Sequence, residues 1–188
     1  MPPDDFTEAG RFLSWVLRHE PQAIGLALDS EGWADIDALV AGAARHERAL
    51  DARSIARVVD TSDKKRFERS ADGRRVRAVQ GHSTPAVSRR LDPVEPPARL
   101  YHGTASRFVG SILRDGLLPG ARHHVHLSAD ASTAREVGRR HGAPVVLVVD
   151  AAGLRAAGQA FHRAENGVWL TGPVPPAFVR VEPADGVR

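Results

Sequence analysis

Hydrophobic positions recur at helical spacing near the N-terminus of the chain. The pattern predicts a first helix over residues 7–18, which Pro21 prevents from continuing far. We expect its apolar side to anchor the helix in a core; that side comprises Phe12, Trp15 and Val16. The helix closes on the polar pair Arg18-His19, in the stretch SWVLRHEP. Such a pair either complements the negative end of the helix dipole or belongs to a functional site.

Two more helices and a hairpin follow the first helix. A short extended piece, GWADI, precedes a helix that Asp35 or Asp37 caps, and Asp51 caps a third helix, DARSIARVVD. In KRFERSADGRRVRAVQG, two segments flank Asp72-Gly73, a pair suited to the positive φ of a tight turn. Three helices followed by a basic hairpin are typical of a winged helix.

The remaining pattern divides the chain into a first lobe (residues 1–81), a linker (82–98) and a second lobe (99–188). Proline and small polar residues replace any period in the linker. In the second lobe, RLYHGT, HHVHLS, APVVLVVD, VWLT and AFVRVEP have the pattern of strands, and two helices end at Gly116 and near Gly142. Because strands and helices do not alternate regularly, we expect an α+β class and not a doubly wound parallel sheet.

Composition narrows the picture further. The chain has no cysteine, so disulfides and thiolate metal sites are excluded, and a reducing compartment such as the cytoplasm fits. We find neither a signal-peptide pattern nor an apolar run of the ~20 residues that a membrane span needs. We therefore expect a cytoplasmic protein without a membrane partner, and a monomer by default.

Basic residues gather in one stretch of the first lobe. Overall, 26 Lys and Arg oppose 23 Asp and Glu, but between Lys64 and Arg77 seven basic residues oppose only Glu68 and Asp72. This excess predicts a surface for a polyanion. Arginines also cluster at predicted element ends, and the planar guanidinium binds phosphate through two hydrogen bonds while keeping its charge in a cleft. Each one alone is explained by dipole complementation or solvation.

Histidines supply two further candidates. His124 and His126 fall on one face of a predicted strand and could bind a metal, but few carboxylates lie near them, and we expect an ordinary half-buried strand and no metal. His102 directly precedes Gly103, a residue that permits close approach of a ligand to the main chain. The hydroxyls of Thr104, Ser106 and Ser128 would converge on it if the two strands are neighbours.

These motifs together resemble a known family. LSWVLRHEP, DKKRFE, LYHGT, VHLSAD with VGRRHG, and NGVWLT occur in the order found in the RNA 2′-phosphotransferases, which are typified by tRNA 2′-phosphotransferase. The resemblance spans residues 12–181, nearly the whole chain.

The resemblance implies a winged-helix RNA-binding lobe over 1–81 and an ADP-ribosyltransferase-like, NAD-binding lobe over 99–188. It implies that NAD⁺ is consumed as a co-substrate, without a metal, and that the partner is an RNA with an internal 2′-phosphate, such as a tRNA from splicing. The 2′-phosphate first displaces nicotinamide from the ribose. The ribose O2″ then takes the phosphate, which yields 2′-hydroxyl RNA and ADP-ribose 1″,2″-cyclic phosphate.

The resemblance also implies the site residues. The family's Arg-His-Arg-Arg set falls on Arg18, His19, Arg66 and Arg140, where Arg140 is preferred to Arg139 because it directly precedes His-Gly in VGRRHG. NAD⁺ is expected at His102, Gly103, Thr104, Ser128 and Arg140. RNA phosphates are expected at Arg18, Lys65, Arg66 and Arg69.

Two alternatives stay open. A winged-helix regulator whose second lobe senses a ligand would explain the basic stretch equally well. An ADP-ribosyltransferase acting on phosphates of nucleic acids or small molecules would use the same site and stop after the first step. Modification of proteins is disfavoured, because the strand in NGVWLT carries no acid and Glu165 lies before its turn.

Overall fold

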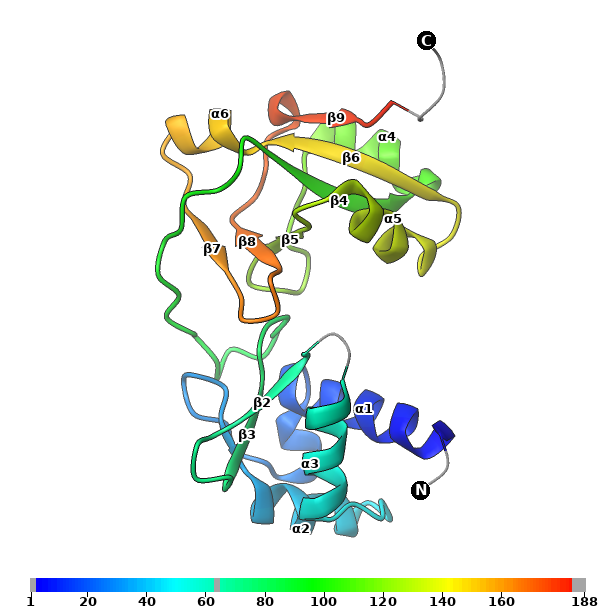
Figure 1. Ribbon diagram of the computed structural model, residues 1–188, viewed down its shortest axis with the longest axis vertical. Coiled ribbons are helices and arrows are strands. Elements are labelled where there is room, and N and C mark those ends of the chain that lie inside the picture. The colour runs from blue at the N-terminus through cyan, green and yellow to red at the C-terminus, as the bar shows by residue number, and fades with distance from the viewer. Residues whose placement is uncertain (1–2, 63–64, 184–188) are drawn as a thin grey trace. The chain divides into compact units, whose positions relative to one another are not determined.

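The computed structural model describes residues 3–62 and 65–183. Contacts within the chain divide it into two compact units, Met1–Arg90 (the N-terminal unit) and Leu91–Arg188 (the C-terminal unit). Each unit combines helices with small antiparallel sheets, which confirms the predicted α+β class (Figure 1). Among the described helices, none is both long and apolar enough to cross a membrane.

Three helices form most of the N-terminal unit. They are α1 (Pro3–Arg18), α2 (Ile36–Arg45) and α3 (Ala52–Thr61), with a 3₁₀ turn η1 (Pro21–Ile24) after α1. Capping by nearby side chains explains where α2 and α3 begin. The Asp35 carboxylate accepts a hydrogen bond from the Ala38 N–H at 2.9 Å, and Asp51 and Ser54 form a reciprocal capping box. The open choice between Asp35 and Asp37 is thereby decided for Asp35.

The first helix differs from its prediction in two respects. It begins at Pro3, about one turn before the expected start at residue 7. Of its three predicted anchors, Phe12 and Val16 are buried, but Trp15 is 41% exposed, so the assignment of Trp15 to the core is wrong. Apolar spacing identifies the side of a helix that faces the core, but Trp15 lies at the margin of that side.

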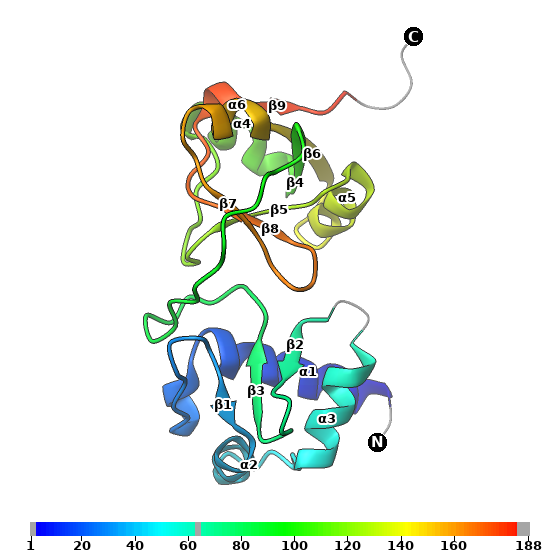
Figure 2. The same cartoon turned by 60° about the vertical axis from the view of Figure 1, so that its left-hand side comes forward.

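A three-stranded sheet completes the N-terminal unit. Its strands are β1 (Ala34–Asp35), β2 (Phe67–Arg69) and β3 (Arg75–Ala78) in the order β1-β3-β2, seen side by side in Figure 2. The hairpin β2-β3 turns at Asp72-Gly73 as predicted, with Gly73 at φ +71°. The Asp72 carboxylate accepts from the Ser70 hydroxyl and from the Arg74 N–H, and these hydrogen bonds lower its pKa.

Two antiparallel sheets build the C-terminal unit. One has the order β4-β6-β9, with β4 (Arg99–Ala105), β6 (Pro144–Asp150) and β9 (Val179–Val181). The other has the order β5-β8-β7, with β5 (Val125–Leu127), β8 (Trp169–Thr171) and β7 (Phe161–Arg163). Both sheets contribute to one core, in which Leu100, Leu127, Leu147 and Phe161 are fully buried.

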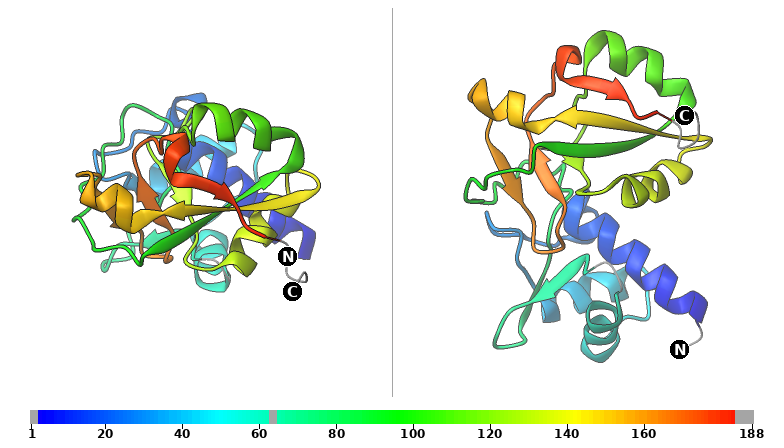
Figure 3. Two further views of the ribbon diagram at one scale, coloured as in Figure 1. Left: turned by 90° about the horizontal axis from the view of Figure 1, so that it is seen from above. Right: turned by 45° about the horizontal axis from the view of Figure 1, so that its top comes forward.

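Helices cover both faces of the β4-β6-β9 sheet. Figure 3 shows α4 (Ser106–Asp115) on one side and α5 (Ala131–Arg139) on the other. Helix α5 ends at Arg139, three residues before Gly142, the residue expected to stop it. The sequence analysis missed β7 and the short helices α6 (Ala151–Ala156) and η2 (Pro176–Phe178).

Residues 82–98 contain no helix or strand, but they are attached on both sides. His82, Thr84 and Val87 are buried in the N-terminal unit. In the C-terminal unit, the Val94 N–H donates to the Phe161 carbonyl at 2.8 Å. The division between units lies at Arg90, within this segment, whose first half is therefore part of the N-terminal core and not a free spacer.

Candidate functional site

Arg18 and His19 lie where α1 ends. The N–H groups of His19 and Glu20 both donate to the Trp15 carbonyl, which closes the last turn before Pro21. The Arg18 guanidinium lies 3.5 Å from the Arg66 carbonyl oxygen and 5.8 Å from the centroid of the Phe67 ring. The fold thus brings the end of α1 to the start of β2, and three of the expected residues, Arg18, His19 and Arg66, belong to one neighbourhood.

A segment that the sequence analysis assigned to the linker completes this neighbourhood. Ser83 Oγ lies 2.8 Å from Nδ1 of His19, and the N–H groups of Ser83 and Thr84 donate to the Arg18 carbonyl. We call Arg18, His19, Arg66 and Ser83 the Arg18 cluster. No local signal in residues 82–98 indicates a contact with residues more than sixty positions earlier, so Ser83 could not be found from the sequence.

The expected RNA-binding residues differ in how they are placed. Lys65 and Arg66 are exposed directly before β2, and Lys65 has a positive φ of 40°, which is uncommon for a residue with a side chain. Arg69, in contrast, pairs with the Asp60 carboxylate at 3.1 Å. Lys64, part of the predicted basic stretch, lies outside the described residues.

Ion pairs reduce the free charge of the hairpin further. Arg75 lies 3.6 Å from Asp29, and Arg77 lies 3.0 Å from Glu68. Arg77 also covers the Trp33 ring at 4.3 Å from its centroid. The basic excess predicted from composition is therefore partly neutralised within the unit.

In the C-terminal unit, His102 has a fixed tautomer. Its Nδ1 lies 3.1 Å from the carbonyl oxygen of His126. Because a carbonyl only accepts, Nδ1 carries the proton, and in the neutral ring Nε2 is an acceptor. Burial lowers the pKa of His102 below its usual value of 6.5, the bond to His126 opposes this, and the charges of His141 and Arg122 lower the pKa further. The ring is therefore neutral at pH 7.

Strand β4 and the residue that follows β5, Ser128, lie side by side, which meets the condition set for the hydroxyls of this region. Tyr101 and Ser128 exchange two backbone hydrogen bonds of 2.9 and 2.7 Å. Backbone groups of alternate residues point to the same edge of a strand, so the N–H and C=O of Gly103 face the edge occupied at Tyr101 by Ser128, away from β6. Thr104 is buried on the face shared with His102.

Gly103 has a structural role that the sequence analysis did not consider. A Cβ at this position would overlap the Ala134 carbonyl oxygen and lie 2.9 Å from the Gly138 nitrogen, both in α5. Gly138 in turn lies against the Thr104 carbonyl. The two glycines let α5 approach β4 closely. Packing therefore explains the glycine at position 103 even without a ligand.

Arg122 is the charged residue that the sequence analysis missed here. Its Nη1 lies 3.1 Å from Nδ1 of His126, and since a guanidinium only donates, this Nδ1 is an acceptor. Partial burial lowers the pKa of Arg122, although much of its side chain is accessible. We call His102, Arg122, His126, Ser128 and His141 the His102 cluster. An arginine two residues before His124-Val125-His126 was the signal available in the sequence.

The stretch VGRRHG holds the expected Arg140 and, beside it, His141. Arg140 is exposed at the end of α5, where its N–H donates to the Val137 carbonyl. The next residue, His141, is close enough for its charge to lower the pKa of His102. The charges of His141 and Arg122 thus both act on His102, and Arg140 is exposed at the end of α5.

The histidines considered for a metal are arranged otherwise. Strand β5 begins at Val125, so His124 precedes it, and the His124 ring packs edge-on against His162 at 6.1 Å. Burial, and then the charges of His162 and His123, lower the pKa of His124. Within residues 3–62 and 65–183, no group of three or more His, Cys, Asp or Glu side chains could hold a metal ion.

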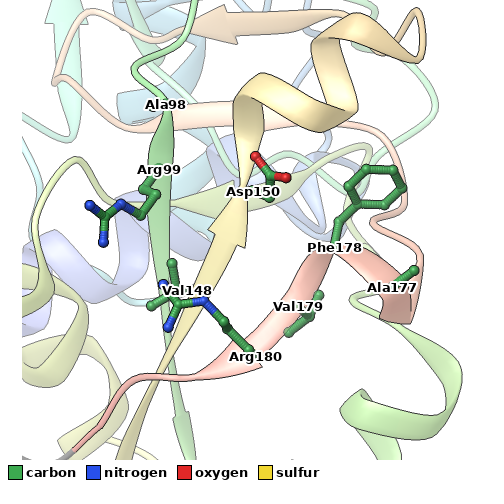
Figure 4. A pocket seen from close by; sticks show the side chains of 8 residues that line it. All are labelled: Ala98, Arg99, Val148, Asp150, Ala177, Phe178, Val179 and Arg180. Carbon is green, nitrogen blue, oxygen red and sulfur yellow. The ribbon is translucent and has the colours of Figure 1, made fainter.

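A separate groove of about 420 Å³ lies along β4, β6 and β9, where Arg99 pairs with Asp150 in the strand register. Figure 4 shows Arg99 and Arg180 on the same side of the sheet, with Phe178 at the far end. The Asp150 carboxylate in this groove accepts from the Gly153 N–H and caps α6. The groove is lined by none of the residues expected in the functional site; its lining is Ala98, Arg99, Val148, Asp150, Ala177, Phe178, Val179 and Arg180.

The family model and the similar proteins found by comparison point to the same family. The model of the family described as "RNA 2′-phosphotransferase, Tpt1 / KptA family" matches residues 4–172. A probable RNA 2′-phosphotransferase of Pseudomonas aeruginosa strain PAO1 is 63% identical over 173 residues, 92% of this chain and 95% of that protein. Proteins of the same name from Burkholderia lata and Escherichia coli O8 are 58% identical (96% of this chain, 93% of that protein) and 53% identical (93% and 95%).

Proposed function

Because this chain belongs to the RNA 2′-phosphotransferase, Tpt1/KptA family, we propose that it removes an internal 2′-phosphate from RNA by transferring it to NAD⁺. In the first step, a phosphate oxygen attacks C1″ of the nicotinamide ribose, the glycosidic C–N bond breaks, and nicotinamide leaves as a neutral molecule. The product is RNA-2′-phospho-ADP-ribose. No general base is required, because the nucleophile is already an anion.

In the second step, the ribose O2″ attacks phosphorus and the bond from phosphorus to the RNA O2′ breaks. A proton leaves O2″ and another reaches O2′, which gives 2′-hydroxyl RNA and ADP-ribose 1″,2″-cyclic phosphate. Negative charge grows on the non-bridging oxygens in the transition state. The chemistry therefore requires fixed positive charge and one group that exchanges protons.

The observation that carries the assignment of NAD⁺ is the tautomer of His102. With Nδ1 bound to the His126 carbonyl and burial favouring the neutral ring, Nε2 is an acceptor suited to a ribose hydroxyl. The N–H and C=O of Gly103, directed to the edge of β4 away from β6, suit the carboxamide of nicotinamide. These features support NAD⁺ as the second substrate of the C-terminal unit.

Phosphate binding is assigned to the positive residues of each unit. In the N-terminal unit, the Arg18 cluster holds the side chains of Arg18 and His19 beside the backbone of Arg66, and the side chains of Lys65 and Arg66 are exposed there. In the C-terminal unit, we assign this role to Arg122 in place of Arg140, because Arg122 contacts His126 and lies in the electrostatic environment of His102. His19 is assigned to proton transfer in the second step.

The unit architectures support the finer fold assignments. Three capped helices with the hairpin β2-β3 support a winged helix that binds RNA, and the two small sheets around one core support an ADP-ribosyltransferase-like unit. The proposal further includes an RNA substrate such as a spliced tRNA, a location in the cytoplasm and a monomeric state.

The proposal is tested with an oligoribonucleotide that carries a single internal 2′-phosphate. When the protein is incubated with this RNA and NAD⁺, one nicotinamide should be released from NAD⁺ per RNA, and the RNA should be left with a 2′-hydroxyl. With an RNA that lacks the 2′-phosphate, no nicotinamide should be released. Absence of both products would favour a regulator that only binds nucleic acid. Accumulation of ADP-ribosylated RNA without cyclic phosphate would favour a transferase that stops after the first step.

A further inference from the structure

Ser83 contacts the end of α1 through both its backbone and its side chain. Its N–H donates to the Arg18 carbonyl at 2.9 Å, and its hydroxyl lies 2.8 Å from Nδ1 of the neighbouring His19. The backbone contact is reinforced by the Thr84 N–H, which reaches the same carbonyl at 3.2 Å. The position of the Ser83 hydroxyl relative to the imidazole is thus fixed by main-chain bonds, independently of the bond between the two side chains.

The residues around Ser83 hold it against the helix end. His82 and Thr84 on either side are buried. Gly81 precedes them with φ +91°, a conformation that a residue with a side chain rarely adopts, and lies against Cδ and the guanidinium of Arg18. This segment, residues 81–84, is consequently a built part of the Arg18 cluster.

A serine hydroxyl suits a histidine that changes its charge. Toward a neutral imidazole it can donate its proton to Nδ1, and toward an imidazolium it can accept the proton that Nδ1 carries. A backbone carbonyl or a carboxylate could serve only an Nδ1 that bears a proton. The contact seen here can therefore persist in both protonation states of His19 with only a rotation of the hydroxyl proton.

We propose that Ser83 is a positioning residue for His19, which it holds in one ring orientation through both protonation states so that Nε2 exchanges the proton in the second step. The inference rests on the proposed function for the identity of that step. It does not require Ser83 to touch the RNA or NAD⁺.

The test compares S83A with S83T and with S88A, a matched loss of an exposed serine hydroxyl five residues further along the chain. Misplacing a reacting group by a fraction of an ångström costs on the order of 10-fold or more in rate. We expect S83A to lower kcat about 10-fold, to change KM for RNA less than about 3-fold, and to accumulate RNA-2′-phospho-ADP-ribose. S83T should recover most of the rate, and S88A should behave as the wild type.

Two further measurements separate positioning from mere stability. In an H19A background, S83A should cause no additional loss, because the residue acts through His19. The ¹⁵N shifts of the His19 ring, assigned by difference with H19N, should differ between S83A and the wild type at the same pH, because Nδ1 no longer meets the Ser83 hydroxyl. This readout uses the free protein and is independent of turnover.

The outcomes distinguish this inference from the proposed function. If the wild type releases no nicotinamide, the proposed function fails, while the ring shifts still report whether Ser83 holds His19. If the wild type turns over and S83A matches it in rate and ring shifts, the inference is overturned. It is equally overturned if S83T is as impaired as S83A, because the loss would then arise from packing and not from the hydroxyl.

Discussion

The two units each hold one histidine in place, but they do so with different partners. In the C-terminal unit, Nδ1 of His102 is bound to a backbone carbonyl, and burial disfavours the charged ring. In the N-terminal unit, Nδ1 of His19 meets the hydroxyl of Ser83. A carbonyl fixes one tautomer, whereas a hydroxyl follows either protonation state. The Nδ1 contact of His102 thus fits a single protonation state, and that of His19 fits both, which agrees with the roles proposed for them.

The comparison extends to how each arrangement can be altered. The partner of His102 belongs to the main chain of β5, which pairs with β8 and is fixed by the sheet. The partner of His19 is a side chain and can be removed by one substitution. Interventions at His19 should consequently affect the rate, and interventions at His102 should affect binding of the second substrate and stability.

The largest expected effect belongs to H19A. Loss of a general acid or base typically costs about 10²- to 10⁴-fold, and we expect this loss in the second step alone, because the first step needs no proton transfer. Single-turnover assays should show nicotinamide released in a burst while RNA-2′-phospho-ADP-ribose accumulates. Full turnover by H19A, with no trapped intermediate, would contradict the assigned role of His19.

The next effect compares two arginines of the C-terminal unit. Removing a fixed positive group from a developing negative charge costs about 10²- to 10³-fold. We expect R122A to lose activity in this range, because Arg122 contacts His126 beside His102. R140A, a matched change at the exposed end of α5, should stay within about 3-fold of the wild type. The reverse ranking would restore Arg140 to the position that the sequence resemblance gave it.

Local signals predicted the elements that local chemistry determines. Asp51 and the turn at Asp72-Gly73 are recognisable because a cap or a tight turn needs specific residues in the same short segment. Strand β6 follows from its continuous apolar run. The helix α6 escaped prediction because six residues carry too little periodicity, although Asp150 caps it.

The parts of the candidate site that escaped prediction depend on contacts distant in sequence. Ser83 lies in a stretch whose composition is typical of a linker, and only the fold brings it to His19. Arg122 lies in a loop whose side-chain directions no period determines, so an arginine in VGRRHG was preferred on motif position alone. Resemblance identified the family, while the choice between Arg122 and Arg140 stays a prediction that the two variants test.

A smaller effect tests the packing role of Gly103. A methyl group there would overlap the Ala134 carbonyl, and relief of the overlap requires α5 to move away from β4. We expect G103A to lower the free energy of unfolding by about 1–3 kcal/mol, the usual cost of overpacking. Thermal unfolding measures this loss. G110A is the control, because a Cβ at Gly110 in α4 meets no atom within 4 Å. Equal melting temperatures of G103A and the wild type would contradict the close approach of α5.

The smallest effect is a dependence of stability on pH. Burial keeps the pKa of His102 in the folded chain below its usual value of 6.5, so between these two values the unfolded chain binds more protons. The contribution of His102 to stability is therefore complete above about pH 6.5 and is lost as the pH falls through the folded-state pKa. His124, whose pKa is also lowered by burial, should add its own dependence of the melting temperature on pH, which H124N removes.

H102N retains a donor for the His126 carbonyl but cannot titrate, and its melting temperature should fall less steeply between pH 7 and pH 5 than that of the wild type. If the melting temperatures of H102N and the wild type fall in parallel with pH, His102 is not the buried neutral histidine that distinguishes its unit from that of His19.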